Sequence, residues 1–204
     1  MKKAFFALLA ILLMFSLACC TKDPQPTQDS ETGLCRGSIK GNTYTSTYTG
    51  ISFTKPDKWR FLSDKELAQA LSISEETINE KEFAASLSEY PSLLDMMVMD
   101  DATGFNLTIG YENLSVTMGK AVTEQEYMEA MTEYLGTMGD MNIGTSEKVS
   151  LCGKDYLKTS FSVFIDGTEM KTDYYIRANN EIMTVITAAY SADVNDINIE
   201  SMFS

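Results

Sequence analysis

Three acidic side chains that are close together in the sequence are the first candidates for chemistry. Asp95, Asp100 and Asp101 would put three carboxylates near one end of a hairpin, and calcium takes such oxygen ligands when loop carbonyls join them. The spacing lacks the alternating aspartates of a typical calcium-binding loop, so a solvated turn is the alternative interpretation. Glycoside hydrolysis needs a second placed acid, which this pattern does not supply.

The chain contains no histidine, and this excludes several catalytic mechanisms. Imidazole is the usual base at neutral pH and the commonest zinc ligand. Ser-His-Asp, Cys-His and HExxH sites are therefore excluded, and an enzyme would depend on carboxylates, lysine, tyrosine or a bound hard metal. The composition favours a binding protein over an enzyme, and we expect no cofactor.

A second group of candidate site residues is aromatic. Tyr48, Phe53 and Trp59, with Pro56 among them, offer a large contact area at low entropic cost and are candidates for a groove that recognises a peptide or a glycan. The alternative is structural. A sole tryptophan after a proline turn is typical of a residue that pins the first strands against the core.

The first 20 residues have the pattern of a secretory signal. Two lysines precede an unbroken apolar run over 4–15, which is too short to span a membrane as a stable helix. The Leu-Ala-Cys-Cys sequence that ends at Cys20 resembles a bacterial lipobox, whose cysteine receives a diacylglyceryl group. Cys20 is the favoured lipidation site because Leu17 then lies three positions before it, and Cys19 is the alternative.

This pattern predicts three parts along the chain: a signal peptide over 1–19, a lipidated tether over 20–34 and a single folded domain over 35–204. Residues 21–33 include two prolines and no apolar side chain, so they cannot bury enough surface to order themselves. Two acyl chains give durable anchoring. We therefore expect a protein held by the lipid bilayer on the extracytoplasmic face of the cell membrane.

The charge of the chain limits its partners. Asp and Glu number 29 against 16 Lys and Arg, for a net charge of −13, and cleavage of the signal would also remove Lys2 and Lys3. Such a surface repels nucleic acid and anionic head groups, and attracts cations or basic proteins weakly at physiological salt. No basic cluster follows the signal, so we exclude nucleic acid as a partner.

Cys35 and Cys152 are the cysteines that follow the predicted lipidation site. An exported protein reaches a compartment where a disulfide between them can persist. Their spacing does not show whether they meet, and two separate thiols are favoured because Cys35 lies near the entry to the domain.

The first half of the folded part contains signals for strands. The range 42–54 is rich in β-formers broken by Gly50 and predicts two short strands around a turn or bulge. The ranges 94–99 and 105–111 are apolar enough for two more strands, and 100–104 between them has the residues of a hairpin loop.

Helix signals alternate with these strands. Ser63 and Thr123 are each followed three residues later by glutamate, a capping box that marks the first turn of a helix. The range 74–87 is helical in composition but weakly periodic, which predicts one or two irregular helices ending before Pro91.

The C-terminal third predicts a three-stranded meander. Asp166-Gly167 is a strong two-residue hairpin signal, and it sets Leu157 opposite Ile176. A second turn at Asn179-Asn180 then sets Ile176 opposite Met183. Apolar side chains share one face of this pairing and polar side chains share the other.

The last strand of the meander, 182–188, is apolar on both faces. This predicts a central position with cover on both sides, and we expect 193–203 to supply one of the covering helices. Together the signals predict an α+β fold, with a mostly antiparallel sheet of about six or seven strands and helices on both faces.

The stretch 48–59, which reads YTGISFTKPDKW, resembles the opening of small extracytoplasmic lipoproteins of clostridia-like bacteria. The ranges 95–97, 112–114 and 123–127 continue the resemblance in order, so it covers nearly all of the chain after Thr43. It implies a PsbP-like α/β/α sandwich. It implies no catalytic site, because that superfamily serves in assembly, binding and scaffolding without a shared activity.

These observations favour a non-catalytic, membrane-anchored module that binds another protein or an envelope component. One rival class is a carboxylate- or metal-dependent hydrolase of envelope polymers, and another is a lipoprotein that binds a small ligand or a cation. Converging carboxylates in a concave pocket would favour the enzyme, and a flat aromatic patch would favour the protein-binding module.

Overall fold

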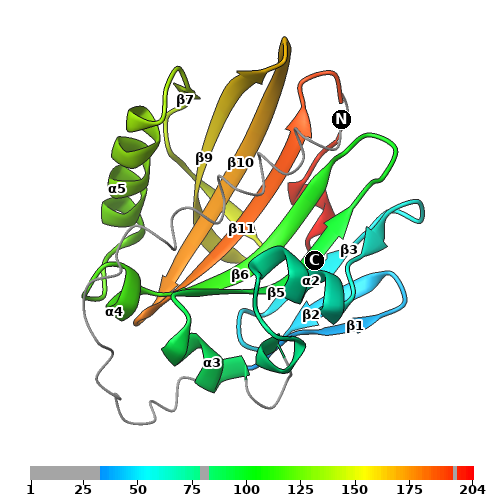
Figure 1. Cartoon of the computed structure of the whole chain (residues 1–204), viewed down its shortest axis with the longest axis vertical. Helices are drawn as coiled ribbons and strands as arrows, with labels where there is room; N and C mark the ends of the chain where they lie inside the picture. Colours follow the sequence, from blue (N-terminus) through cyan, green and yellow to red (C-terminus); the bar gives the residue numbers. More distant parts are fainter. Residues whose placement is uncertain (1–32, 79–82, 195–196) are drawn as a thin grey trace.

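The fold is built on one large antiparallel sheet (Figure 1). The computed structural model describes residues 33–78, 83–194 and 197–204. In the large sheet the strands follow the order β4-β5-β6-β11-β10-β9-β7, with β8 paired to β9, and a three-stranded sheet has the order β1-β2-β3. The strands of the small sheet are β1 (Ser38–Lys40), β2 (Thr43–Ser46) and β3 (Ile51–Thr54). Those of the large sheet are β4 (Arg60–Phe61), β5 (Ser92–Met99), β6 (Asn106–Asn113), β7 (Asn142–Ile143), β8 (Glu147–Leu151), β9 (Lys154–Ile165), β10 (Thr168–Asn179) and β11 (Ile182–Ser191).

The hairpin predicted at Asp166-Gly167 is confirmed. Strands β9 and β10 pair in a register that sets Leu157 opposite Ile176, as the sequence predicts. Asp166 and Gly167 have φ values of 50° and 81°. A type I′ turn requires positive φ at both central residues, and this local requirement fixes the register of the whole hairpin.

The register predicted for the next hairpin is wrong by two residues. Ile176 lies opposite Val185 and not opposite Met183, because the turn lies one residue further along the chain, at Asn180 and Glu181. Asn180 takes the left-handed conformation, with φ of 54°. A shift of two residues keeps the alternation of faces, so the side chains predicted to point inward still do so.

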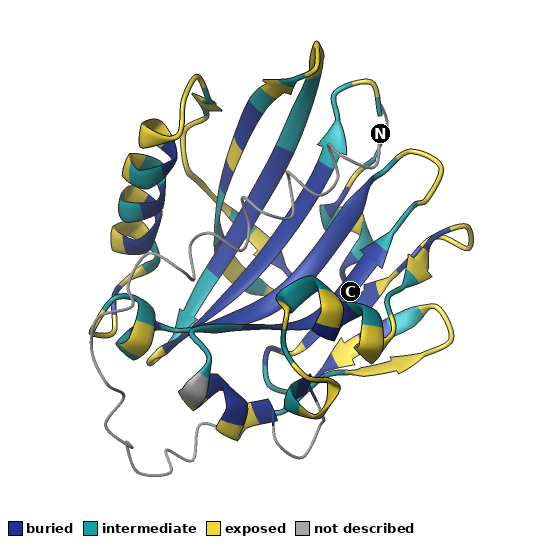
Figure 2. Cartoon of the chain, viewed as in Figure 1, coloured by how far each residue is buried: buried dark blue, intermediate teal, exposed yellow. Residues whose placement is uncertain are grey.

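The central position predicted for the last strand of the meander is confirmed. Strand β11 lies between β6 and β10, and Figure 2 shows these strands buried along most of their length. Ile186 and Ala188 face one core, while Met183 and Val185 face the other. Burial on both faces explains why this strand shows no apolar-polar alternation.

One face of the large sheet, here called the helical face, carries α2 (Asp64–Leu71) and α5 (Glu124–Thr137). Helix α5 packs Tyr127 and Met131 against side chains of β9, β10 and β11, including Tyr174. Helix α2 packs Leu67 against Met97 of β5. The two helices lie at opposite ends of this face, with central strands between them (Figure 1).

The opposite face is covered mainly by β-structure. Tyr44, Ile51 and Phe53 of the small sheet pack into one cluster with Ile109 and Ile186 of the central strands. Helix α3 (Phe83–Glu89) covers the rest of this face through a separate cluster. The expectation of helices on both faces is therefore met, but the small sheet does most of the covering on this side.

The remaining helical segments are short. They are η2 (Glu75–Ile78), α4 (Leu114–Thr117) and η3 (Glu200–Met202). The irregular helical range predicted at 74–87 corresponds to η2 and α3. Among the helices of the described ranges, none combines the length and the apolar character needed to cross a bilayer.

The helix predicted over 193–203 is wrong. The described part of this range contains only the single turn η3. The Asn198 side chain accepts a hydrogen bond from the Ser201 amide, as an N-cap residue does, but the turn that follows ends at Met202. Phe203 instead forms a β-bridge with Phe53, and their rings lie 5.3 Å apart. The segment therefore closes the edge of the small sheet, where the Ser204 amide also donates to the Ser52 carbonyl oxygen.

A polar cluster holds this C-terminal segment on the large sheet. Glu200 accepts hydrogen bonds from Lys158 Nζ at 2.7 Å and from the Tyr175 hydroxyl at 2.8 Å. The Lys158 ammonium also lies 5.2 Å from the centre of the Tyr175 ring. Lys158 lies on the face of this hairpin that the sequence predicts to be polar, and the contact with Glu200 shows that the chain end covers part of that face.

Both predicted capping boxes are confirmed. Thr123 Oγ1 accepts from the Glu126 amide at 3.2 Å, and Glu126 accepts in return from the Thr123 amide at 2.9 Å. We expect Thr123→Ala to lower the free energy of unfolding by about 1 kcal/mol, measured by urea denaturation. Thr132→Ala, inside the same helix, is the control and should be neutral or slightly stabilising, because alanine is the better helix former. Equal losses would contradict the capping role.

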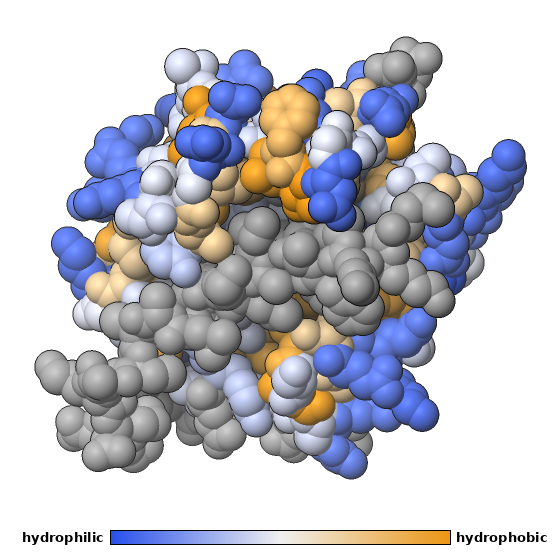
Figure 3. Space-filling view, turned by 45° about the horizontal axis from the view of Figure 1, so that its top comes forward, coloured by the Kyte–Doolittle hydropathy of each residue, from blue (hydrophilic) through white to orange (hydrophobic). Residues whose placement is uncertain are grey.

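Figure 3 shows mainly hydrophilic side chains on the described part of the surface in view, with small apolar areas among them. Large exposed apolar side chains are Ile39, Val116, Met138 and Phe164, which come from separate elements. Isolated apolar residues of this kind are ordinary on a soluble surface. A concave site is therefore a better candidate for ligand binding than these scattered positions.

Candidate functional site

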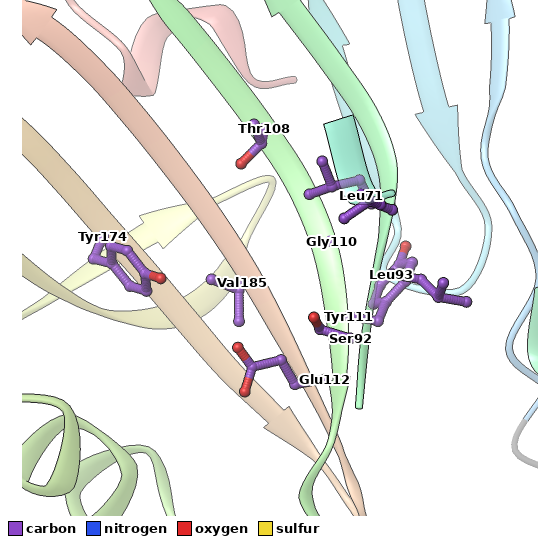
Figure 4. Close-up of a pocket in the computed structure, with 10 residues that line it drawn as sticks. Leu71, Ser92, Leu93, Thr108, Gly110, Tyr111, Glu112, Tyr174 and Val185 are labelled. Carbon is purple, nitrogen blue, oxygen red and sulfur yellow. The ribbon is translucent and has the colours of Figure 1, made fainter. Parts of the chain in front are cut away.

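A pocket opens on the helical face beside α2 (Figure 4). Its floor is formed by β5, β6, β11 and β10, and the last residue of α2 forms part of its wall. The cavity itself is small, about 30 Å³, and it is partly open to solvent. The lining residues are Leu71, Ser92, Leu93, Leu94, Thr108, Gly110, Tyr111, Glu112, Tyr174 and Val185.

The side chains of the lining residues divide the pocket into a polar end and apolar walls. In Figure 4, Glu112 and Tyr174 lie near Val185, and Thr108 lies further along the same strand as Glu112. Leu71 lies on the α2 side. Thr108 and Glu112 are four positions apart in β6, a length of about 13 Å in an extended strand.

Glu112 is the distinctive residue of this pocket. Glu112 is only 8% exposed. Burial raises the pKa of its carboxyl to about 7, although a hydrogen bond with the Tyr127 hydroxyl offsets part of the rise. Of the described residues that line the pocket, Glu112 alone carries a formal charge. The carboxyl therefore changes between its neutral and charged forms near neutral pH.

Two tyrosines face Glu112 from neighbouring elements. Burial raises the pKa of Tyr127 on α5 and of Tyr174 on β10, and the negative charge of Glu112 adds to both shifts. Both phenols therefore keep their protons at neutral pH. They give the polar end of the pocket neutral hydroxyl groups beside one titrating carboxyl.

Gly110 keeps the floor of the pocket open. A Cβ atom at this position would lie 2.8 Å from the Leu93 carbonyl oxygen and 3.2 Å from Leu94 Cδ2. The neighbouring strand has a register irregularity between Leu94 and Met96, which brings its backbone close to the glycine. A glycine opposite a bulge is typical of a strand that another backbone approaches closely.

Asp95 has a structural position and does not line this pocket. It is 1% exposed and accepts hydrogen bonds from the Gly37 amide at 3.0 Å and from the hydroxyls of Tyr44 at 2.6 Å and Tyr111 at 3.1 Å. Arg36 Nε lies 3.7 Å from its carboxylate. Burial nevertheless raises the pKa of Asp95, because desolvation outweighs these partners.

Asp100 and Asp101 lie in the loop after β5, and the structure does not bring Asp95 together with them. Asp100 accepts from the Ala102 amide and the Thr103 hydroxyl within its own loop. Asp101 forms an exposed ion pair with Arg60 Nε at 2.9 Å. Among the described residues, no group of three or more acidic or cysteine side chains is placed to hold a metal ion. This arrangement fits the solvated turn.

The aromatic candidates contact the core more than the solvent. Phe53 is fully buried, and Trp59 is 7% exposed and stacks on Phe105 with ring centres 4.2 Å apart. Tyr48 is half-buried and meets the edge of Tyr111 at 5.6 Å. Their placement matches the structural alternative, in which these side chains pin the first strands to the large sheet.

The candidate lipidation sites Cys19 and Cys20 lie outside the described residues, as does the predicted tether up to residue 32. Cys35 and Cys152 are separate thiols, as the sequence favours. Cys35 Sγ lies 3.1 Å from the hydroxyl of Thr47. Cys152 Sγ lies 3.1 Å from the Ser204 carbonyl oxygen at the chain end.

Sequence reasoning missed Glu112 because it ended this strand at Tyr111. Strand β6 continues to Asn113, and Glu112 therefore shares a side of the pleat with Thr108 and Gly110. The signal was a glutamate at an inward-facing position directly after an apolar run. Glu112 can be recognised as inward-facing only if β6 is predicted to continue to Asn113.

The fold and the pocket together define an α+β domain with a large antiparallel sheet and one recessed carboxyl. The sequence matches no protein-family model and no curated protein. The structure is similar to the solution structure of cyanobacterial PsbP (CyanoP) from Synechocystis sp. PCC 6803, with 14% identity and a TM-score of 0.45 over 89% of this chain and 99% of that one. It is also similar to a crystal structure from Bacteroides thetaiotaomicron VPI-5482, with 12% identity and a TM-score of 0.41 over 76% of this chain and 43% of that one.

Proposed function

We propose that this chain is a membrane-anchored extracytoplasmic lipoprotein whose folded domain is a non-catalytic binding module. The observation that carries the proposal is the lipobox-like sequence that ends at Cys20, directly after a short apolar run. A diacylglyceryl group on this cysteine would fasten the domain to the outer face of the membrane. The polar residues 21–33 would separate the domain from the lipid surface.

The chemistry of the described residues supports binding more than catalysis. The pocket holds one carboxyl and no second acid among its described lining residues, so it lacks the pair of acids that a glycosidase uses. The sequence also has no histidine to serve as a general base. A hydrolase of envelope polymers therefore has less support than a binding module.

The pocket also bears on the kind of ligand. A small-molecule site is concave, with mostly apolar walls and a few polar groups that fix orientation. Leu71, Leu94 and Val185 supply such walls, and Glu112 supplies the polar group. The aromatic residues considered for a protein-binding surface are mostly buried, so a small ligand has more structural support than a flat protein contact.

We expect Cys20→Ala to abolish lipid attachment and to move the protein from the membrane fraction to the soluble or secreted fraction. The measurement is mass spectrometry of the N-terminal peptide, combined with fractionation of cells that express the chain with its own signal. Cys19→Ala is the matched control and should keep the lipid on Cys20. An unmodified N-terminus in the wild-type protein would refute the anchor, and loss of lipid only in Cys19→Ala would move it to Cys19.

A further inference from the structure

The charge of the pocket beside α2 selects among possible ligands. Glu112 is the single formal charge among the described lining residues, and the chain as a whole has a net charge of −13. Both features favour a cation over an anion or a neutral molecule. A buried carboxylate without an opposite charge is costly, and a bound cation removes that cost.

The walls of the pocket distinguish an organic cation from a metal ion. A hard metal ion takes six or more oxygen ligands, whereas the pocket presents one carboxyl next to the apolar side chains of Leu71, Leu94 and Val185. The Tyr174 ring adds an aromatic surface near the carboxyl. Apolar walls and a ring suit the carbon skeleton of an amine, and three N–H donors suit the carboxylate.

We propose that this pocket binds a small organic ammonium ion that carries an apolar group, with the Glu112 carboxylate as its counter-ion. The ammonium group lies in the cavity at Glu112, and the apolar group packs at the open side of the pocket against the half-buried Leu71. The hydroxyls of Thr108 and Thr187 already form a hydrogen bond with each other at 2.6 Å. The Thr108 end of the pocket therefore does not need a polar group from the ligand. The inference rests on the proposed binding function and names its ligand class.

The affinity for such a ligand depends on pH in a defined direction. The titratable groups that face Glu112 are Tyr127 from α5 and Tyr174 from β10, and the raised pKa of each keeps it neutral at the pH values considered. An alkyl ammonium ion keeps its charge up to about pH 9, close to lysine. Affinity should therefore rise as Glu112 ionises and level off above neutrality.

The test is a titration of the full-length protein, purified from membranes in a non-ionic detergent, with 2-phenylethylamine at pH 8. Calorimetry or ligand-observed NMR measures the dissociation constant. Glu112→Gln should weaken binding about tenfold or more, because it removes a charge-assisted hydrogen bond and its charge. The wild-type protein should show a loss of similar size between pH 8 and pH 5.5.

Two controls separate the pocket from general effects of charge. Glu133→Gln removes a carboxylate from the exposed side of α5 and should change the affinity less than about twofold. 2-Phenylethanol has the same skeleton without the charge, and its binding should not respond to Glu112→Gln. Leu71→Trp, at a half-buried position on the wall, should weaken the binding of both compounds by filling the pocket.

The proposal is overturned if 2-phenylethylamine shows no saturable binding, or if it binds the wild-type and Glu112→Gln proteins equally. These outcomes leave the lipid anchor intact, because mass spectrometry of Cys20 in Glu112→Gln would still show the modification. Failure of the anchor, in turn, would leave the amine affinity of the folded domain unchanged. The two proposals can therefore fail separately.

Discussion

Asp95→Ala is expected to lower the free energy of unfolding by about 3–5 kcal/mol. The change leaves the hydroxyls of Tyr44 and Tyr111 and the Gly37 amide without their carboxylate acceptor. It also leaves Arg36, whose side chain is 11% exposed, with one fewer negative partner. The single tryptophan is buried, so its fluorescence during urea denaturation measures the loss.

Asp101→Ala is the matched control for this experiment. The Asp101 side chain is 64% exposed, and its ion pair with Arg60 lies at the surface. Exposed pairs contribute about 0–1 kcal/mol, so the control should stay close to the wild-type protein. Equal effects of the two substitutions would mean that the hydrogen bonds of Asp95 contribute no more to stability than a surface ion pair.

The position of Asp95 explains the size of this expected effect. Its partners come from the chain before β1, from β2 and from β6, so one carboxylate ties the small sheet to the large one. The atoms around the Asp95 carboxylate are closely packed. A Cβ atom on Gly37 would lie 2.3 Å from the Tyr44 ring, which shows how closely the backbone approaches this cluster.

The elements that sequence reasoning predicted well are those fixed by local chemistry. Asp166-Gly167 needs only its own backbone preferences to set a register, and Thr123 with Glu126 needs only one helical turn. The error at Asn180 arises because two adjacent asparagines both tolerate the left-handed conformation. Sequence reasoning then placed the turn one residue too early.

The elements that were missed depend on distant partners. Phe203 is held by Phe53, far away in the chain, and β8 exists because it pairs with the edge of β9. Nothing in the local sequence of either segment specifies that partner. The helix predicted over 193–203 therefore does not form, because helix propensity takes no account of the long-range pairing between Phe203 and Phe53.

Dependence on distant partners also explains why the candidate site was not predicted. The chemistry of an aspartate or glutamate depends on burial, and burial depends on what packs above it. Asp95, Asp100 and Asp101 are close in sequence, yet one is buried in a network and the others lie in an exposed loop. Glu112 has no distinctive neighbours in sequence, and its setting arises only where β5, β6, β10 and β11 meet α2.

Glu112→Gln is expected to change stability in a way that depends on pH. Burial raises the pKa of Glu112 from 4.5 to about 7 in the folded protein. The folded state thus prefers the neutral carboxyl, and this contribution is fully present below the unfolded pKa and is lost as pH rises to about 7. Glutamine has nearly the same shape and does not titrate. The unfolding free energy of the variant minus that of the wild-type protein should therefore increase by about 2.5 kcal/mol from pH 5 to pH 8.

Urea denaturation of both proteins at several pH values measures this difference, and the groups that the two chains share cancel in it. Most of the increase should fall between pH 5 and pH 7, with a plateau above, because Glu112 is then ionised in both the folded and the unfolded states. Glu133→Gln, on the exposed side of α5, reports any effect of net charge alone. A difference that stays constant from pH 5 to pH 8 would show that the Glu112 carboxyl is hydrated like an exposed one. The pocket would then lack the dry carboxylate that an ammonium ligand requires.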